Sequence, residues 1–232
     1  MPGSAIFITG IGTGIGKTIV SAALVEKLNA DYWKPVQSGD LDDTDTDKVR
    51  NLITNKTSVF HPETYALTQP FSPHKSAAID GVSIDKNKFS IPETNNRLII
   101  EGAGGLMVPL NTNFLIIDLI KQLGAEVILV SRNYLGSINH TLLSADALKQ
   151  RGIPIKGIIF NGIKEFCSNW RERAEQVRNP APALQLILDD PFYNMRTTVT
   201  EPDQARFQLT DPGRMGYVPF PLLYRCGVCG HP

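Results

Sequence analysis

A glycine-rich loop near the start of the chain limits the folds that are open to it. Residues 7–18 read FITGIGTGIGKT, an apolar run that breaks into a loop ending in Gly16, Lys17 and Thr18. In such a loop the backbone N–H groups turn toward one anion, the lysine reaches the β- and γ-phosphates, and the hydroxyl holds Mg²⁺. The loop therefore predicts binding of ATP or GTP.

The spacing of this loop differs from the usual pattern, because five residues separate Gly10 from Gly16 and the pattern has four. A glycine turn that serves packing alone is the alternative. Residues 5–9 read as a strand and residues 19–28 have the apolar spacing of a helix with one buried face. This context favours the phosphate loop.

Charge and composition exclude several classes of partner. The chain of 232 residues has 23 basic and 23 acidic side chains, so no overall basic field attracts nucleic acid or an anionic membrane. It has neither a membrane-spanning apolar run nor a signal-peptide pattern, and its three cysteines form no disulfide framework. We expect a cytoplasmic protein with small-molecule partners.

Apolar runs and helical patterns alternate through the first 162 residues, which predicts an α/β fold of the P-loop NTPase type, with a mostly parallel sheet and helices on both faces. The segment 55–92 is expected to be a long active-site connection with a short helix near 74–78. The other predicted helices are 17–28, 45–52, 116–124 and 137–151, and the predicted strands are 5–9, 30–34, 98–101, 127–131 and 157–160.

The end of the chain differs from the rest. Residues 1–162 contain 11 lysines and 4 arginines, whereas later residues contain 1 lysine and 7 arginines. We expect 1–162 to be the nucleotide-binding and catalytic domain and 163–232 to be a divergent tail, poorly ordered or of foreign origin; an arginine-rich appendage is the alternative. Half of a zinc-binding pattern lies near the C-terminus, formed by Cys226, Cys229 and His231. Because the chain has no second pair of ligands, we favour a frayed terminus over a zinc site.

Three further segments with charged residues come after predicted strands. The carboxyl ends of such strands form the edge of the sheet at which α/β folds bind ligands. Lys34 ends a strand and is followed by Pro35, which restricts the backbone and indicates an ammonium with a fixed direction toward the site. The alternative is an ordinary solvated lysine at a strand end. Residues 40–47 contain five aspartates, most of which are expected to cap a helix, while one faces Mg²⁺. Glu101 ends a buried strand before a predicted glycine turn at 102–105, and its charge requires a cation partner.

Together these residues resemble the ATP-dependent dethiobiotin synthetases of biotin synthesis. The likeness extends over residues 4–162. It rests on motifs in the family's order: Gly10, Thr13, Gly16, Lys17 and Thr18; Lys34-Pro35-Val36 with Ser38-Gly39; Ser72-Pro73-His74; Glu101 to Gly105; Leu135 to His140; and a strand ending at Asn161.

The resemblance implies that CO₂ adds to one amine of 7,8-diaminononanoate and that the carbamate attacks the γ-phosphate of ATP. The resulting carbamic-phosphoric anhydride is closed by the second amine, which gives dethiobiotin, ADP and phosphate. It also implies Mg²⁺ as cofactor, ATP as co-substrate and a homodimer. Lys17 and Lys34 would be the catalytic cations, in agreement with the need of phosphoryl transfer for positioning and fixed positive charge.

Other roles are also implied by the resemblance. Thr18, Asp45 and Glu101 would bind Mg²⁺, with Asp43 and Asp47 as neighbours of Asp45 that compete for this assignment. Ser38 would bind the carbamate, and Ser137 and Asn139 the substrate carboxylate across a two-fold interface. The nucleotide would contact Thr13, Gly14, Ile15, Gly16, Lys17, Thr18, Asp45, Glu101, Gly102, Ala103, Gly104 and Asn161, whose amide would read the adenine.

Two departures from the family pattern are visible. Gly12 stands where the family often has an acidic residue, and the segments that complete the family's adenine pocket are not recognisable after Asn161. Two other functions remain open, namely another ATP-dependent amidating or carboxylating enzyme and a partitioning-type ATPase switch. The partitioning class has a second loop lysine where this chain has Gly12.

Overall fold

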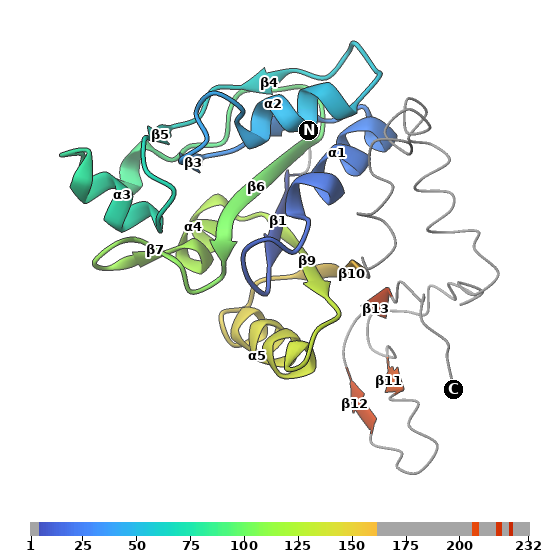
Figure 1. The fold of residues 1–232 in the computed structure, drawn as a ribbon. Helices are drawn as coiled ribbons and strands as arrows, with labels where there is room; N and C mark the ends of the chain where they lie inside the picture. The colour runs from blue at the N-terminus through green and yellow to red at the C-terminus, as the bar shows by residue number, and fades with distance from the viewer. Residues whose placement is uncertain (1–4, 162–205, 209–216, 220–222, 225–232) are drawn as a thin grey trace.

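The computed structural model describes residues 5–161, 206–208, 217–219 and 223–224. In this part of the chain, seven strands form one sheet in the order β13, β10, β9, β1, β6, β2, β4, and all neighbouring pairs are parallel (Figure 1). Their carboxyl ends therefore meet at one edge, where α/β sheets bind ligands. The strands are β1 (Ala5–Gly10), β2 (Asp31–Trp33), β4 (Phe60–His61), β6 (Leu98–Gly105), β9 (Glu126–Arg132), β10 (Ile155–Asn161) and β13 (Leu223–Tyr224).

The helices agree closely with those predicted. The first two have the predicted bounds, α3 is one residue longer at each end, and α4 and α5 each end one residue earlier than predicted. They are α1 (Lys17–Leu28), α2 (Asp45–Leu52), α3 (Pro73–Ile79), α4 (Ile116–Leu123) and α5 (Ser137–Gln150), with one short 3-10 helix, η1 (Lys86–Lys88).

Alternation of side chains along β1 explains why helices cover both faces of the sheet. Ile6 and Ile8 lie in one buried apolar cluster with Val25 of α1, whereas Phe7 lies in the other with Leu148 of α5. Helices α1 and α2 contribute to the first cluster, and α4 and α5 to the second, as their positions in Figure 1 indicate. The predicted α/β fold with a parallel sheet and two helical layers is confirmed.

The connection at 55–92 contains more regular structure than predicted. Besides α3 it holds β4, η1 and β5 (Tyr65–Leu67), and β5 pairs in parallel with β3 (Val36–Ser38). A hairpin of β7 (Pro109–Asn111) and β8 (Phe114–Leu115) follows strand β6 in the chain. Strands of two or three residues are too short to give a periodic signal in the sequence.

Most of the predicted tail lies outside the described residues, as do Cys226, Cys229 and His231, so the expectations for it stay predictions. Its described pieces are β13 and the antiparallel pair β11 (Arg206–Gln208) and β12 (Tyr217–Pro219). Within the described part of the chain, none of the helices has the length and apolar character needed to span a bilayer.

Candidate active site

The phosphate loop joins β1 to α1, and other parts of the protein brace it. The N–H groups of such a loop point toward an anion, so its carbonyl groups point away and need donors. Arg132 Nη1 donates to the carbonyl of Gly14 at 3.1 Å, and Asn161 Nδ2 donates to the carbonyl of Ile15 at 2.9 Å. These bonds give the loop a defined shape without a ligand.

Two glycines give the loop its turns. Gly14 and Gly16 have φ angles of 69° and 92°, in the left-handed region that glycine adopts without strain. Helix α1 starts directly after Gly16 and has no side-chain cap. Its first N–H groups are therefore available to an anion, as a phosphate site requires.

Lys17 lies inside the loop. Its Nζ donates to the carbonyl of Gly12 at 3.0 Å, and the residue is only 7% exposed. Burial lowers the pKa of this ammonium to about 8, although the charge of Glu101 opposes the shift. A phosphate bound beside this ammonium would favour its charged form and so oppose the effect of burial.

Strand register brings three polar side chains to one face of the sheet. Tyr32 of β2 pairs with Ile99 of β6, and both lie in the apolar cluster that α1 covers. Side chains two residues apart share a face of a strand. Lys34 follows Tyr32 by two residues and Glu101 follows Ile99 by two, so both lie under α1 at the carboxyl edge.

Glu101 is the centre of this group. Its Oε1 accepts from Thr18 Oγ1 at 2.9 Å and from Lys34 Nζ at 3.3 Å, and its Oε2 accepts from Tyr32 Oη at 3.0 Å. Lys34 also forms an ion pair with Asp45 Oδ2 at 2.5 Å. The cation partner that the sequence requires for Glu101 is therefore Lys34, and both residues are at most 3% exposed.

The charges in this group stabilise one another. Burial alone would lower the pKa of the Lys34 ammonium, but the charges of Glu101 and Asp45 raise it above its ordinary value. Burial alone would raise the pKa of the Asp45 carboxyl, but the Lys34 charge brings it below its ordinary value. Lys34 is thus a charged, fixed ammonium and not a solvated strand-end lysine.

The structure distinguishes the three aspartates near α2. Asp47 completes the capping box of the helix, since its carboxylate accepts from the N–H and hydroxyl of the N-cap residue Thr44. Asp43 lies 3.8 Å from Lys48 at the surface. Of these three, Asp45 alone forms an ion pair with Lys34, so it is the candidate that reaches the site.

The oxygen donors of this group fit a magnesium ion. The Thr18 hydroxyl and the carboxylates of Asp45 and Glu101 are hard oxygen ligands, and the two carboxylates already share one cation, the Lys34 ammonium. Among the described residues, no cluster of three or more His, Cys, Asp or Glu side chains forms a metal cage made of protein alone. Mg²⁺ takes few protein carboxylates and completes its shell with water and phosphate oxygens.

The predicted glycine turn at 102–105 is wrong, because β6 continues through Gly105. Gly105 pairs with Gly10, and a Cβ on Gly105 would lie 3.2 Å from the Gly10 carbonyl oxygen, so the absent side chain permits the pairing. Gly102, Ala103 and Gly104 therefore belong to a strand that ends against the phosphate loop. A Cβ on Gly104 would lie 3.6 Å from the Thr13 hydroxyl.

Ser38 ends β3, and its hydroxyl is buried without a hydrogen-bond partner among the described residues. An unpaired buried hydroxyl is unfavourable by about 1 to 3 kcal/mol. Such a group in a native protein calls for an explanation, and a ligand is one.

Ser137 and Asn139 lie in the first turn of α5. Ser137 is buried and Asn139 is exposed. No described hydrogen bond or ion pair joins either residue to Lys34 or Glu101, so the substrate contacts expected of Ser137 and Asn139 stay predictions.

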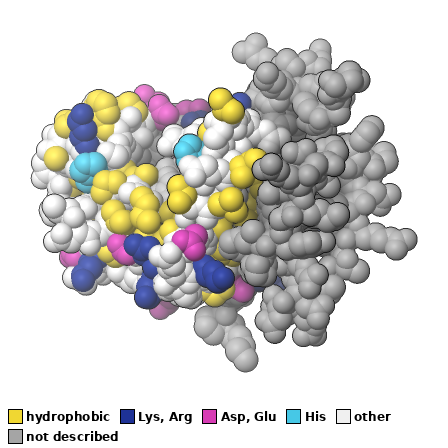
Figure 2. Space-filling model, turned by 90° about the horizontal axis from the view of Figure 1, so that it is seen from below, with side chains coloured by type: hydrophobic (Ala, Val, Ile, Leu, Met, Phe, Trp, Pro, Cys, Tyr) yellow, Lys and Arg dark blue, Asp and Glu magenta, His cyan; other side chains and the backbone are white. Residues whose placement is uncertain are grey.

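The surface around α5 is apolar. Leu135 is fully exposed, and four neighbouring apolar or aromatic side chains are 43% to 60% exposed: Met107, Tyr134, Ile138 and Leu143. Figure 2 views the molecule from below, the side on which α5 lies, and hydrophobic side chains gather on that face. A hollow of about 670 Å³ lies between the phosphate loop and α5, with Ile11, Met107 and Leu143 in its lining.

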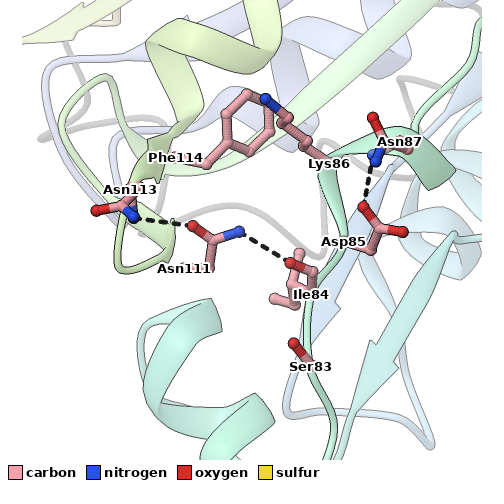
Figure 3. Close-up of a pocket in the computed structure, with 8 residues that line it drawn as sticks. All are labelled: Ser83, Ile84, Asp85, Lys86, Asn87, Asn111, Asn113 and Phe114. Carbon is pink, nitrogen blue, oxygen red and sulfur yellow. Dashed lines mark hydrogen bonds between the residues drawn. The ribbon is translucent and has the colours of Figure 1, made fainter.

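A second hollow, of about 560 Å³, is lined by none of the predicted site residues (Figure 3). Its amides bond to the protein itself: Asn111 Nδ2 donates to the carbonyl of Ile84, and the Asn87 N–H donates to Asp85, both at 2.9 Å. The Asn111 bond joins residues 83–87 to the β7–β8 hairpin, and the Asn87 bond lies within that segment. The hollow is a junction of loops, and no ligand is assigned to it.

The sequence prediction missed Tyr32 and Arg132. A tyrosine two residues before Lys34 shares its strand face, a signal that the sequence contains. An arginine at the end of a buried strand carries a weaker signal, because such residues are commonly solvated.

Comparison with known proteins agrees with this geometry. Residues 4–185 match the family model described as AAA domain. Over 156 residues, the chain is 59% identical to the ATP-dependent dethiobiotin synthetase BioD of Christiangramia forsetii, covering 67% of this chain and 75% of that protein. The protein of the same name from Cytophaga hutchinsonii is 57% identical over 157 residues, covering 67% of this chain and 76% of that protein.

Among solved structures, a ParA family ATPase from Chlorobium tepidum is 13% identical with a TM-score of 0.40, covering 75% of this chain and 80% of that one. That likeness is too distant to support an argument. The relatives at more than half identity decide the matter: the chain belongs to the ATP-dependent dethiobiotin synthetase family.

Proposed function

We propose that this chain uses ATP and CO₂ to convert 7,8-diaminononanoate into dethiobiotin. One amine and CO₂ form a carbamate with loss of a proton, and a carbamate oxygen attacks the γ-phosphorus of ATP and expels ADP. The second amine then attacks the carbonyl carbon of the mixed anhydride, expels phosphate and closes the urea ring. The observation that carries the proposal is the convergence of Thr18, Lys34, Asp45 and Glu101 beside a braced phosphate loop.

Lys34 supplies fixed positive charge in this proposal. Its ammonium is buried and oriented by two carboxylates, so it needs little reorganisation to meet the charge on the carbamate and on the transferring phosphoryl group. Lys17 supplies the second cation from within the loop. It exchanges the Gly12 carbonyl for a phosphate oxygen when ATP binds.

Thr18, Asp45 and Glu101 would hold Mg²⁺. When bound, Mg²⁺ neutralises charge on the β- and γ-phosphates of ATP. The Ser38 hydroxyl, which lacks a partner among the described residues, would donate to the carbamate. The apolar lining of the hollow beside the loop suits the methylene chain of the diamine.

We also infer a homodimer in which α5 of one subunit completes the substrate site of the other. Helix α5 begins after Gly136 with no side-chain cap, so its first N–H groups suit a carboxylate. The exposed apolar side chains around it, among them Leu135 and Ile138, supply the surface that a two-fold contact would bury. Ser137 and Asn139 would then reach the substrate of the partner.

A substitution on this surface tests the dimer. Leu135→Arg introduces a charge into the exposed apolar surface beside α5, outside the lining of the hollow, and we expect a monomer by light scattering. Its KM for diaminononanoate should rise while its affinity for ATP stays unchanged. A monomeric variant with the wild-type KM would rule out the shared site.

Product analysis tests the reaction. Full-length protein is incubated with diaminononanoate, Mg·ATP and ¹³C-bicarbonate, and mass spectrometry follows the label into the carbonyl of dethiobiotin. One ADP should form per dethiobiotin, and Lys17→Ala should abolish both. An amidating or carboxylating enzyme of another pathway would leave the diamine unchanged, and a partitioning-type switch would hydrolyse ATP at a rate that the diamine does not alter.

A further inference from the structure

Tyr32 binds one carboxylate oxygen of Glu101, and the other polar groups of the site bind the second oxygen. Glu101 Oε1 receives Thr18 and Lys34, whereas Oε2 receives the Tyr32 hydroxyl at 3.0 Å. A carboxylate anchored through one oxygen cannot rotate without breaking that bond. The direction in which Oε1 points therefore depends on Tyr32.

The tyrosine itself is fixed in place. It is 0% exposed, and its backbone N–H donates to the carbonyl of Val59 at 2.9 Å. Its ring is tilted against that of Phe60, with centroids 5.8 Å apart, and the Arg50 guanidinium lies 4.8 Å from the centroid of the Phe60 ring. Packing thus determines where the hydroxyl lies.

The hydroxyl also stays a donor. Its oxygen lies 3.0 Å from Glu101 Oε2, and an ionised carboxylate can only accept, so the phenol is the donor of this bond. A protonated phenol has one hydrogen to give, and here Glu101 receives it.

We propose that Tyr32 is a positioning residue, which orients the Glu101 carboxylate for the divalent cation bound with the nucleotide. The inference rests on the proposed role of Glu101 as a magnesium ligand. Partners of this kind hold metal ligands in the geometry that the ion needs, and their loss typically lowers metal affinity about 10- to 100-fold.

Tyr32→Phe removes the hydroxyl and keeps the ring, and Mn²⁺ binding reports the effect directly. Mn²⁺ is titrated into full-length protein with saturating ADP, and free Mn²⁺ is followed by electron paramagnetic resonance. We expect the Mn²⁺ Kd of Tyr32→Phe to rise about 10-fold or more. In turnover assays the concentration of Mg²⁺ for half-maximal rate should rise in parallel, and excess Mg²⁺ should restore kcat.

Tyr65→Phe is the matched control. Tyr65 is also buried, its ring is tilted against Phe89 with centroids 5.6 Å apart, and its hydroxyl accepts from the Asp85 N–H at 2.8 Å. Loss of the Tyr65 hydroxyl in Tyr65→Phe can lower the melting temperature but should leave the Mn²⁺ Kd unchanged. If Tyr32→Phe does not fold, Tyr32→Met, which also lacks the donor, takes its place with the same expected rise in Kd.

Glu101→Gln separates this inference from the proposed function. If Glu101→Gln loses Mn²⁺ while Tyr32→Phe binds it as wild type does, the role of Tyr32 is wrong and the metal site stands. If Glu101→Gln keeps the wild-type Kd, the assignment of Glu101 as a ligand fails, whether or not dethiobiotin forms.

Discussion

Arg132 and Asn161 pair in register at the carboxyl ends of β9 and β10, and their side chains donate to consecutive carbonyl groups of the phosphate loop, those of Gly14 and Ile15. The loop is therefore held by two strands far from it in sequence. The Asn161 amide has a second hydrogen and an acceptor oxygen beyond the bond to Ile15. Asn161 can therefore bind the Ile15 carbonyl and hydrogen-bond to an adenine at the same time. The adenine contact stays a prediction.

Arg132→Ala should weaken nucleotide binding, because the Gly14 carbonyl loses its donor and the loop loses part of its preformed shape. We expect an effect of about 1 kcal/mol, or about fivefold in the Kd of Mg·ATP measured by titration calorimetry. Arg97→Ala is the control, since Arg97 is exposed and has no described side-chain contact. Equal Kd values for the two variants would show that Arg132 does not brace the loop.

Lys34→Gln should affect both turnover and stability. It leaves the buried Glu101 and the nearby Asp45 without their shared cation, and removing one partner of a buried pair typically destabilises a protein by about 3 to 5 kcal/mol. We expect turnover to fall about 100-fold or more, since a fixed charge near the phosphoryl group is lost.

Calorimetry with and without Mg·ATP separates the two effects of Lys34→Gln. The loss of melting temperature should be large without ligand and smaller with Mg·ATP, because in the proposed site the metal would supply another cation to the two carboxylates. A variant with near-wild-type turnover would mean that Lys34 belongs to the scaffold and not to the chemistry.

Strong local signals were read correctly from the sequence. The loop at Gly16 and Lys17 has its own pattern, and the four longer strands and the longer helices have apolar periodicity. The need of Glu101 for a cation follows from burial alone, and Lys34 meets it. These features depend on residues close in sequence or on the chemistry of one side chain.

Pairwise features were not predictable from single-residue patterns. Tyr32 reads as a core aromatic because its role lies in a bond to a strand that begins 66 residues later in the sequence, at Leu98. The continuation of β6 through Gly105 depends on the close approach of Gly10, which no local pattern records. The function of Ser137 and Asn139 depends on a second subunit in the proposed dimer.

The buried Asp31 carboxylate gives a pH dependence of stability. Burial would raise its pKa, but hydrogen bonds from Asn96, Thr94 and the Val59 N–H, with the charge of His61, bring the pKa below its ordinary value of 3.8. The stabilisation is therefore fully present above that value and is lost as pH falls through the lower pKa of the folded state.

Asp31→Asn should remove this stabilisation. We expect a loss of about 1 to 3 kcal/mol in the free energy of unfolding at pH 7, and the difference from wild type should shrink below about pH 4. Urea denaturation at pH 7, 5, 4 and 3 measures it. Glu93→Gln alters an exposed carboxylate with no described contact, and its difference from wild type should be small at every pH. A difference for Asp31→Asn that does not change with pH would contradict the argument.

Ser38→Ala should separate stability from function. The Ser38 hydroxyl is buried without a partner among the described residues, so its removal takes away an unsatisfied polar group and should leave the melting temperature unchanged or slightly higher. The carbamate would lose a donor, and we expect kcat/KM for diaminononanoate to fall about 10-fold, which corresponds to about 1.4 kcal/mol. Ser58 also has a buried hydroxyl without a described partner, but it lies outside the proposed site, so Ser58→Ala should match the thermal behaviour without the loss of activity. Equal kcat/KM values for the two variants would leave the Ser38 hydroxyl as a packing defect with no part in substrate binding.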